Sequence, residues 1–121
     1  MKEYLVIGNS KEVFRIATED ILYVSADGNY SQIYFTYGDT VNISLSIAKV
    51  EEGLTDLCPQ TSKDFVRVGR SLIINLSHLF KVDVSGRKLV LLDRNKERKE
   101  VKASNASLKE LVDFIGNKTI R

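Results

Sequence analysis

The chain has very few of the side chains from which disulfides, metal sites and catalytic centres are built. Among its 121 residues, Cys58 is the only cysteine and His78 the only histidine. One cysteine excludes an intramolecular disulfide, and one cysteine with one histidine cannot supply the several ligands of a His/Cys metal site. His78 lies in the segment NLSHLF, without the glycines of a nucleophile elbow, so it gives no basis for a catalytic triad.

Glycine-rich phosphate-binding motifs are also missing. The chain contains neither G-x-x-x-x-G-K-[ST] nor G-x-G-x-x-G. The adjacent carboxylates Glu51 and Glu52 fall in a helical segment, where such a pair is more typical of a solvated face than of a catalytic dyad. We therefore expect a protein that is not an enzyme and needs no cofactor or metal.

Long hydrophobic runs are absent as well. No apolar run approaches the roughly 20 residues that a membrane helix needs, and the N-terminal segment MKEYLVIGNSKEV lacks the apolar stretch of a signal peptide. Together with the single cysteine, these absences predict a cytoplasmic protein without a membrane segment. The length is that of one domain, which can bury a core without disulfides or metal.

Short segments rich in β-branched and aromatic residues recur along the chain, with turn signals such as GNS, DGN, YGDT and Ser85-Gly86 between them. Ser85-Gly86 suits a tight turn, because glycine tolerates a positive φ without steric cost. Ten candidate strands in 121 residues predict a mostly antiparallel β fold. The segments are Tyr4–Ile7, Glu12–Ile16, Asp20–Val24, Ser31–Tyr37, Val41–Ser44, Phe65–Val68, Leu72–Ile74, Leu79–Val84, Leu89–Leu92 and Glu100–Ala103.

Two segments have helical periodicity instead. In SIAKVEEGLTDL (46–57) and SLKELVDFIGNK (107–118), apolar residues recur at helical spacing and include Leu54 and Leu111, which we expect to pack in the core. Cys58-Pro59 is a plausible end for the first helix. Ser107 with Glu110 fits a capping box at the start of the second, and Gly116 suits its C-terminal cap.

The charge is small overall but unevenly distributed. Residues 1–62 carry 4 Lys and Arg against 9 Asp and Glu, whereas residues 63–121 carry 14 against 7. The densest basic stretch is GRKLVLLDRNKERKEVK, from Gly86 to Lys102. This polarity is compatible with an anionic partner for the second half, although such runs are usually solvated strand faces and hairpin tips.

Three elements of the chain resemble the LytTR DNA-binding domain, the output module of many bacterial response regulators of the LytR/AlgR/AgrA type. The most specific is FVRVGRSLIIN (65–75), where the family typically has F-x-R-x-H-R-S-[YF]-[LIV]-[VI]-N, and Gly69 stands at the position of the usual His. The second is Asp20–Tyr30, which is similar to I-x-Y-x-x-A-x-G-N-Y. The third precedes the last helix, where Ser104 is followed by Asn105 and the family often has Ser-Arg.

The resemblance covers residues 4 to 115 approximately and implies an elongated fold of small, mostly antiparallel β-sheets with two short helices. We therefore expect residues 1–121 to form a single LytTR-like domain. The family is non-enzymatic and binds double-stranded DNA through loops, commonly at short direct repeats and often with two copies of the domain. A homodimer or tandem binding on DNA is thus expected. The short N-terminus leaves no room for a receiver domain, which favours a free-standing protein or an excised domain.

The matched loops provide the candidate DNA-binding residues. Arg70 is the first, because a guanidinium in a loop can bind guanine O6 and N7 or clamp a phosphate; a salt bridge to Asp64 or Asp83 is the structural alternative. Arg67 precedes it on the opposite strand face and is either a contact or a structural residue. Asn75, which ends the same motif, is expected to be structural.

The other two loops add further candidates. Asn29 can read adenine, and Tyr30 can contact phosphate or sugar, unless the pair forms a turn with Tyr30 in the core. Ser31 can contact a phosphate. In the third element the candidates are Lys102, Ser104 and Asn105; Ser104 can instead cap the helix. Five nearby cations can add non-specific attraction to DNA, but we favour the interpretation that each is a solvated surface residue: Lys88, Arg94, Lys96, Arg98 and Lys99.

These observations lead to two hypotheses of different kinds. The first is a sequence-specific DNA-binding transcription regulator, supported by the three motifs and by the basic second half. The alternative is a β-rich protein-interaction module of the same fold with weak or no DNA readout, suggested by Gly69 and Asn105 at two positions where the family usually has other residues.

Overall fold

Ten strands and two α-helices follow one another along residues 2–121, which are the residues described by the computed structural model. The strands are β1 (Tyr4–Gly8), β2 (Val13–Ala17), β3 (Ile21–Asp27), β4 (Tyr30–Phe35), β5 (Thr40–Ile43), β6 (Phe65–Val68), β7 (Leu72–Asn75), β8 (Leu79–Asp83), β9 (Lys88–Leu92) and β10 (Arg98–Lys102). The helices are α1 (Ile47–Leu57) and α2 (Asn105–Ile115). All ten expected strands are present, with ends that differ by three residues or fewer.

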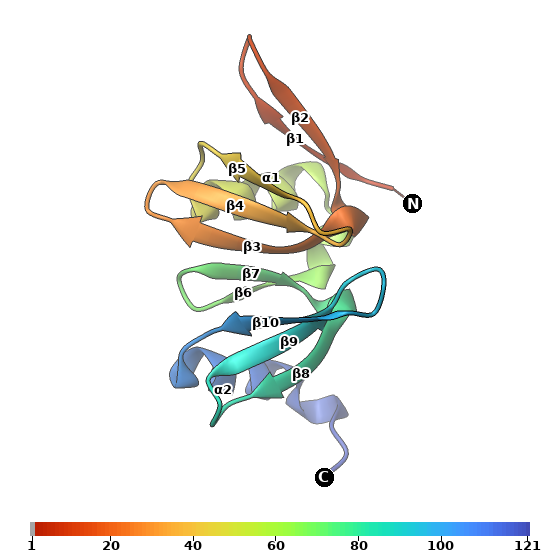
Figure 1. Ribbon diagram of the computed structural model, residues 1–121, viewed down its shortest axis with the longest axis vertical. Helices are drawn as coiled ribbons and strands as arrows, with labels where there is room; N and C mark the ends of the chain where they lie inside the picture. The colour runs from red at the N-terminus through yellow and green to blue at the C-terminus, as the bar shows by residue number, and fades with distance from the viewer. Residues whose placement is uncertain (1) are drawn as a thin grey trace.

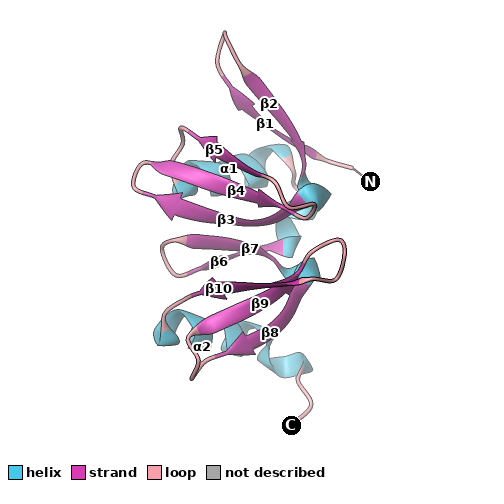
Figure 2. Ribbon diagram, viewed as in Figure 1, coloured by secondary structure: helices cyan, strands magenta, loops and turns pink. Residues whose placement is uncertain are grey.

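The strands form three antiparallel sheets stacked along the long axis of the molecule (Figure 1). The β1–β2 hairpin lies at one end, a five-stranded sheet of order β5-β4-β3-β7-β6 in the middle, and a three-stranded sheet of order β10-β9-β8 at the other end. Figure 2 shows α1 behind the five-stranded sheet and α2 behind the three-stranded one. The expected mostly β, elongated fold with two short helices is confirmed. None of the helices in residues 2–121 is long and apolar enough to cross a membrane.

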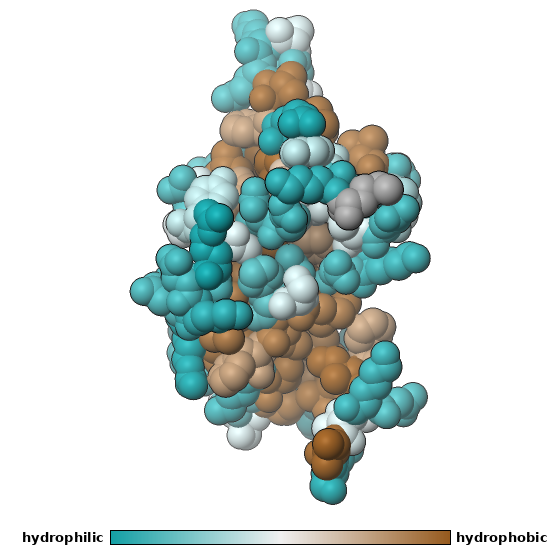
Figure 3. All heavy atoms as spheres, turned by 90° about the vertical axis from the view of Figure 1, so that its right-hand side faces the viewer, coloured by the Kyte–Doolittle hydropathy of each residue, from teal (hydrophilic) through white to brown (hydrophobic). Residues whose placement is uncertain are grey.

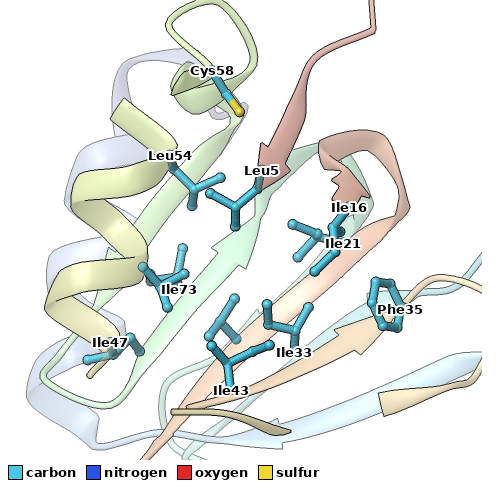
Figure 4. Close-up of a cluster of buried hydrophobic side chains, with 12 residues drawn as sticks. Leu5, Ile16, Ile21, Ile33, Phe35, Ile43, Ile47, Leu54, Cys58 and Ile73 are labelled. Carbon is cyan, nitrogen blue, oxygen red and sulfur yellow. The ribbon is translucent and has the colours of Figure 1, made fainter. Parts of the chain in front are cut away.

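Two hydrophobic clusters hold the stack together, and the central strands contribute to both. Ile73 points into the first cluster, with β1, β2 and α1, whereas its neighbours Leu72 and Ile74 point into the second, with β9 and α2. A strand that is buried on both faces is apolar at successive positions rather than at alternate ones, which explains the apolar run Leu72–Ile74 before Asn75. Figure 4 shows how Leu5 and Ile16 converge with Leu54 of α1 in the first cluster.

Both helices bury the expected stripe, but α2 begins earlier than predicted. Leu54 and Leu111 are 2% and 3% exposed, so their assignment to the core is confirmed. Ser104, rather than Ser107, is the N-cap of α2, and its Oγ accepts a hydrogen bond from Ser107 N at 3.1 Å. The predicted capping box at Ser107 and Glu110 is therefore wrong, because Ser107 already lies within the first turn.

Gly116 and Gly86 lie where the sequence predicts them, at the C-cap of α2 and in the β8–β9 turn. With φ −41°, Gly116 leads on into a short 3-10 turn. In the β8–β9 turn the positive φ belongs to Arg87 (55°) and not to Gly86. Gly86 instead leaves space for the Asp83 carboxylate, whose Oδ2 would lie 2.3 Å from a Cβ at this position.

Candidate nucleic-acid interface

Three connections that are distant in the sequence lie along one edge of the stack, the left-hand edge in Figure 1. They are the β3–β4 turn, the β6–β7 turn and the β10–α2 junction. β3 and β6 both pair antiparallel with β7, so they run in the same direction and end at the same edge of the sheet. Strand direction thus brings two of the three matched elements together, and the close packing of Gly69 on Ser107 places the start of α2 beside the second. We call this surface the loop edge.

The β3–β4 turn presents Asn29 and Tyr30 to solvent. Asp27 pairs with Tyr30 across the hairpin, which leaves Gly28 and Asn29 as the two turn residues. Gly28 has φ +61°, as the first position of a tight two-residue turn of the II′ type requires. Tyr30 is 57% exposed, so it does not pack in the core, and both side chains are free to meet a ligand.

Ser31 follows directly but belongs to the interior. The residue is 0% exposed, and its Oγ donates a hydrogen bond to the Leu45 carbonyl at 2.8 Å. This bond ties β4 to the segment that leads into α1. A hydroxyl in this position is satisfied within the protein and does not reach the surface of the loop edge.

The β6–β7 turn carries Arg70 at its tip. Gly69 begins the turn with φ +63°, and a Cβ here would lie 2.6 Å from Ser107 Oγ, so the turn packs closely on the first turn of α2. The Ser71 carbonyl accepts a hydrogen bond from Ala26 N at 2.8 Å. The backbone on both sides of Arg70 is therefore held, while its side chain is exposed.

Arg67 lies beneath this turn and forms its hydrogen bonds within the protein. Its Nη1 bonds Glu51 Oε1 of α1 at 2.9 Å, and its Nη2 donates to the Arg70 carbonyl at 3.0 Å. The Arg67 side chain is only 29% exposed. Of the two arginines in the motif, Arg67 is thus engaged by the protein and Arg70 is the one that faces solvent.

The acidic partners considered for Arg70 do not hold it. Within residues 2–121 no ion pair joins Arg70 to Asp64 or Asp83. The Asp83 carboxylate instead accepts a hydrogen bond from Gly86 N at 2.9 Å, and this bond holds its pKa below the usual 3.8. Asp83 is therefore occupied by its own turn, and the Arg70 guanidinium is available to an external anion.

The β10–α2 junction contributes an exposed lysine and two polar side chains that are hydrogen-bonded within the protein. Lys102 is exposed at the end of β10. Ser104 is also exposed but caps α2, and its Oγ lies 2.7 Å from Ser107 Oγ. Asn105 Nδ2 donates to the Val84 carbonyl at 2.7 Å, which fastens the start of α2 to the end of β8. The amide at position 105 thus has a structural partner.

Sequence reasoning missed Arg87 as a member of this surface. It is exposed in the β8–β9 turn, and its carbonyl accepts a hydrogen bond from Ala103 N at 3.1 Å, beside the β10–α2 junction. A shallow groove in the loop edge is lined by residues of the β6–β7 turn, the β8–β9 turn and the β10–α2 junction together with β3, including Ser25, Gly69, Arg70, Arg87, Lys102, Ser104 and Ser107. The signal in the sequence was the basic residue after Ser85-Gly86, but nothing there placed it beside Lys102.

Not every cation of the basic stretch is available at the loop edge. Lys88 lies opposite Lys102 in the β9–β10 register, but its Nζ is paired with Glu100 at 3.0 Å. Arg94 and Lys96 lie in the β9–β10 connection, on the opposite side of the molecule in Figure 1. Figure 3, which faces that side, shows hydrophilic side chains mixed with hydrophobic patches. The basic run is thus divided between two edges.

No group of three or more His, Cys, Asp or Glu side chains is gathered as a metal site in residues 2–121. Cys58 is buried at the end of α1, and burial raises the pKa of its thiol.

Asn75 is also buried. Its Nδ2 donates a hydrogen bond to the Ile21 carbonyl at 2.8 Å, and its Oδ1 accepts one from Ser77 N at 3.1 Å, in agreement with the structural role expected for it.

Comparison with known proteins agrees with this arrangement. The family model described as the LytTr DNA-binding domain matches residues 11–116. An uncharacterized response regulatory protein of Vibrio cholerae is 30% identical over 93 residues, which are 75% of this chain and 34% of that protein. The chain therefore spans about a third of that relative. The fold also matches the LytTr DNA-binding domain of a protein described as a methyl-accepting/DNA response regulator from Bacillus cereus, with a TM-score of 0.63, 18% identity, and coverage of 96% of this chain and 99% of that one.

Proposed function

Since this chain belongs to the LytTr DNA-binding domain family, we propose that it binds double-stranded DNA in a sequence-specific way through the loop edge and thereby regulates transcription. The observation that carries the proposal is the exposed Arg70 side chain on a turn whose Arg70 and Ser71 carbonyls both accept hydrogen bonds within the protein. A planar guanidinium with a fixed origin can bind guanine O6 and N7 together, a contact that discriminates by about 1–3 kcal/mol against the wrong base.

The remaining residues of the loop edge suit supporting contacts. Lys102 and Arg87 lie on the same groove and can bind phosphates, which fix register without reading sequence. Asn29 and Tyr30 project from the neighbouring turn, where an amide can read adenine and a phenol can bond a phosphate. Ser104 already caps α2, so in this proposal its helix N-terminus, rather than its hydroxyl, faces the backbone of the duplex.

We further propose that two copies bind adjacent direct repeats. The turns of the loop edge follow one another along the long axis of the molecule (Figure 1), so a duplex that touches all of them runs along that axis. A second copy on a direct repeat then keeps the same orientation and lies further along the duplex, in a head-to-tail arrangement. The Vibrio cholerae relative, described as a response regulatory protein, supports a regulatory role.

The test is selection of bound sites from a random duplex pool, with wild type, Arg70→Ala and Arg94→Ala in parallel. Arg94→Ala is the matched control, because it removes the same charge from the opposite edge. We expect wild type and Arg94→Ala to enrich the same repeat and Arg70→Ala to lose it. Enrichment of no sequence by the wild type would contradict the proposal and favour a protein-interaction module, whereas full enrichment by Arg70→Ala would remove Arg70 from the reading surface.

A further inference from the structure

We infer that Glu51, on α1, is a positioning residue for DNA recognition, because through Arg67 it fixes the backbone from which Arg70 projects. The inference rests on the proposed function and deepens it. Glu51 lies in the middle of α1 and belongs to none of the turns on the loop edge. Its influence on recognition is therefore indirect, and no motif in the sequence links it to Arg70.

The link is a chain of two contacts through one guanidinium. Glu51 Oε1 binds Nη1 of Arg67 at 2.9 Å, and Nη2 of the same group donates to the Arg70 carbonyl at 3.0 Å. Because the guanidinium is planar, anchoring one Nη to a carboxylate restricts the direction in which the other can donate. Without Glu51, the long side chain regains rotamers that leave the Arg70 carbonyl unbonded.

The unpaired Nε of Arg67 indicates that these two contacts determine where the side chain lies. Nε is buried and has no hydrogen-bond partner among the described residues. Buried donors are usually satisfied, so the side chain adopts this position in spite of Nε and not because of it. The contacts that compensate are those to Glu51 and to the Arg70 carbonyl.

The change of charge makes the inference testable. Removing the negative charge of Glu51 should strengthen binding to DNA, whereas losing the contact that positions Arg70 should weaken binding to the selected site. A carboxylate near a DNA-binding edge repels phosphates, so its neutralisation alone should strengthen non-specific binding. Neutralising Glu51 also releases the Arg67 cation, which can then attract any phosphate. Loss of positioning should instead weaken binding to the selected site. The change of charge acts on every duplex alike and leaves the ratio of specific to non-specific affinity nearly unchanged, whereas loss of positioning lowers that ratio.

The experiment compares Glu51→Gln with Glu52→Gln. Glu52 is the next residue on α1, its side chain is 61% exposed, and its partner at 3.8 Å is Lys49, which does not touch the turn. The two variants thus make the same change of charge one residue apart. We expect Glu51→Gln to lower the specificity ratio by about tenfold, the fold-change associated with one charge-assisted hydrogen bond, and Glu52→Gln to change it by less than about twofold. Arg67→Lys, which keeps the charge but loses the fork, should resemble Glu51→Gln.

A second measurement does not depend on DNA. In backbone relaxation experiments, the order parameters of Gly69, Arg70 and Ser71 should fall in Glu51→Gln and stay at wild-type values in Glu52→Gln. If the two variants have the same order parameters and the same specificity ratio, the inference is overturned while DNA binding stands. If the wild type selects no site, the proposed function fails, and unchanged order parameters in Glu51→Gln would then overturn the positioning role on their own.

Discussion

Replacement of Gly69 by alanine should destabilise the protein for two separable reasons. The residue has φ +63°, a conformation that costs an L-residue about 1 kcal/mol relative to glycine. The new Cβ would also lie 2.6 Å from Ser107 Oγ, which forms a hydrogen bond of 2.7 Å with Ser104 Oγ. Moving that hydroxyl away breaks the bond and costs about a further 1 kcal/mol. The total is about 2 kcal/mol, or roughly 8 °C in Tm for a chain of this size.

A double-mutant cycle with Ser107→Ala separates these two contributions. Once the hydroxyl is gone, the nearest atom is the Cβ of residue 107 at 3.4 Å, which is a tolerable contact. The strain from the positive φ remains in the double variant, whereas the steric conflict does not. Equilibrium urea unfolding of all four proteins should therefore give a favourable coupling of about 1 kcal/mol between positions 69 and 107, with unchanged m-values.

Two outcomes would refute this reasoning. A Gly69→Ala variant within about 0.5 kcal/mol of wild type would mean that the turn relaxes freely and does not need glycine. Destabilisation with no coupling to Ser107 would assign the whole effect to φ and remove the packing of the turn against α2. Either result would also weaken the view that the Arg70 turn is held in place by its surroundings.

Three further predictions concern other parts of the molecule. Asn75→Ala should lower the free energy of unfolding by about 3 kcal/mol in urea titrations, since it leaves the buried Ile21 carbonyl unbonded; a loss below about 1 kcal/mol would contradict this. Hydrogen bonds, first of all from Thr61 N–H, hold the pKa of Glu3 below its usual 4.5, so this stabilisation is complete above pH 4.5 and lost as the pH falls through the lowered value; acid titrations of Glu3→Gln should show a flatter decline there, and identical curves would refute it. Lys102→Ala should reduce the slope of log affinity against log salt by about 1 for all duplexes, and an unchanged slope would exclude a phosphate contact.

Local patterns predicted the strands well because each is bounded by turn residues whose chemistry is visible in the sequence. The DGN and YGDT segments contain Gly28 and Gly38, and both adopt positive φ in their turns. The start of α2 was misplaced because Ser104 and Ser107 are both good N-cap residues, and the choice depends on a tertiary contact. That contact is the bond from Asn105 to the Val84 carbonyl, which draws the chain into the helix earlier.

The roles of individual site residues were harder to predict, since they depend on neighbours far away in the sequence. The sequence places Arg67 and Arg70 in one motif, but only the fold brings Glu51 to Arg67. Ser31 is adjacent to the exposed Tyr30, yet the strand alternation turns it towards the Leu45 carbonyl. Membership of a motif therefore does not show whether a candidate side chain can contact a ligand or supports the fold. Its solvent exposure and its hydrogen-bond partners within the protein do.

Strand direction explains why only some of the cations in the basic second half of the chain can contact one duplex. In the three-stranded sheet, β8 and β10 run in the same direction, and β9 runs opposite to both. The connections after β8 and β10 therefore lie at one edge, with Arg87 and Lys102, whereas the connection after β9 lies at the other, with Arg94 and Lys96. A straight duplex laid along the loop edge meets the first pair and not the second. Because consecutive connections alternate between the two edges, each edge carries fewer cations than the basic stretch of the sequence suggests. The direction of each strand determines which of these cations lie beside Arg70.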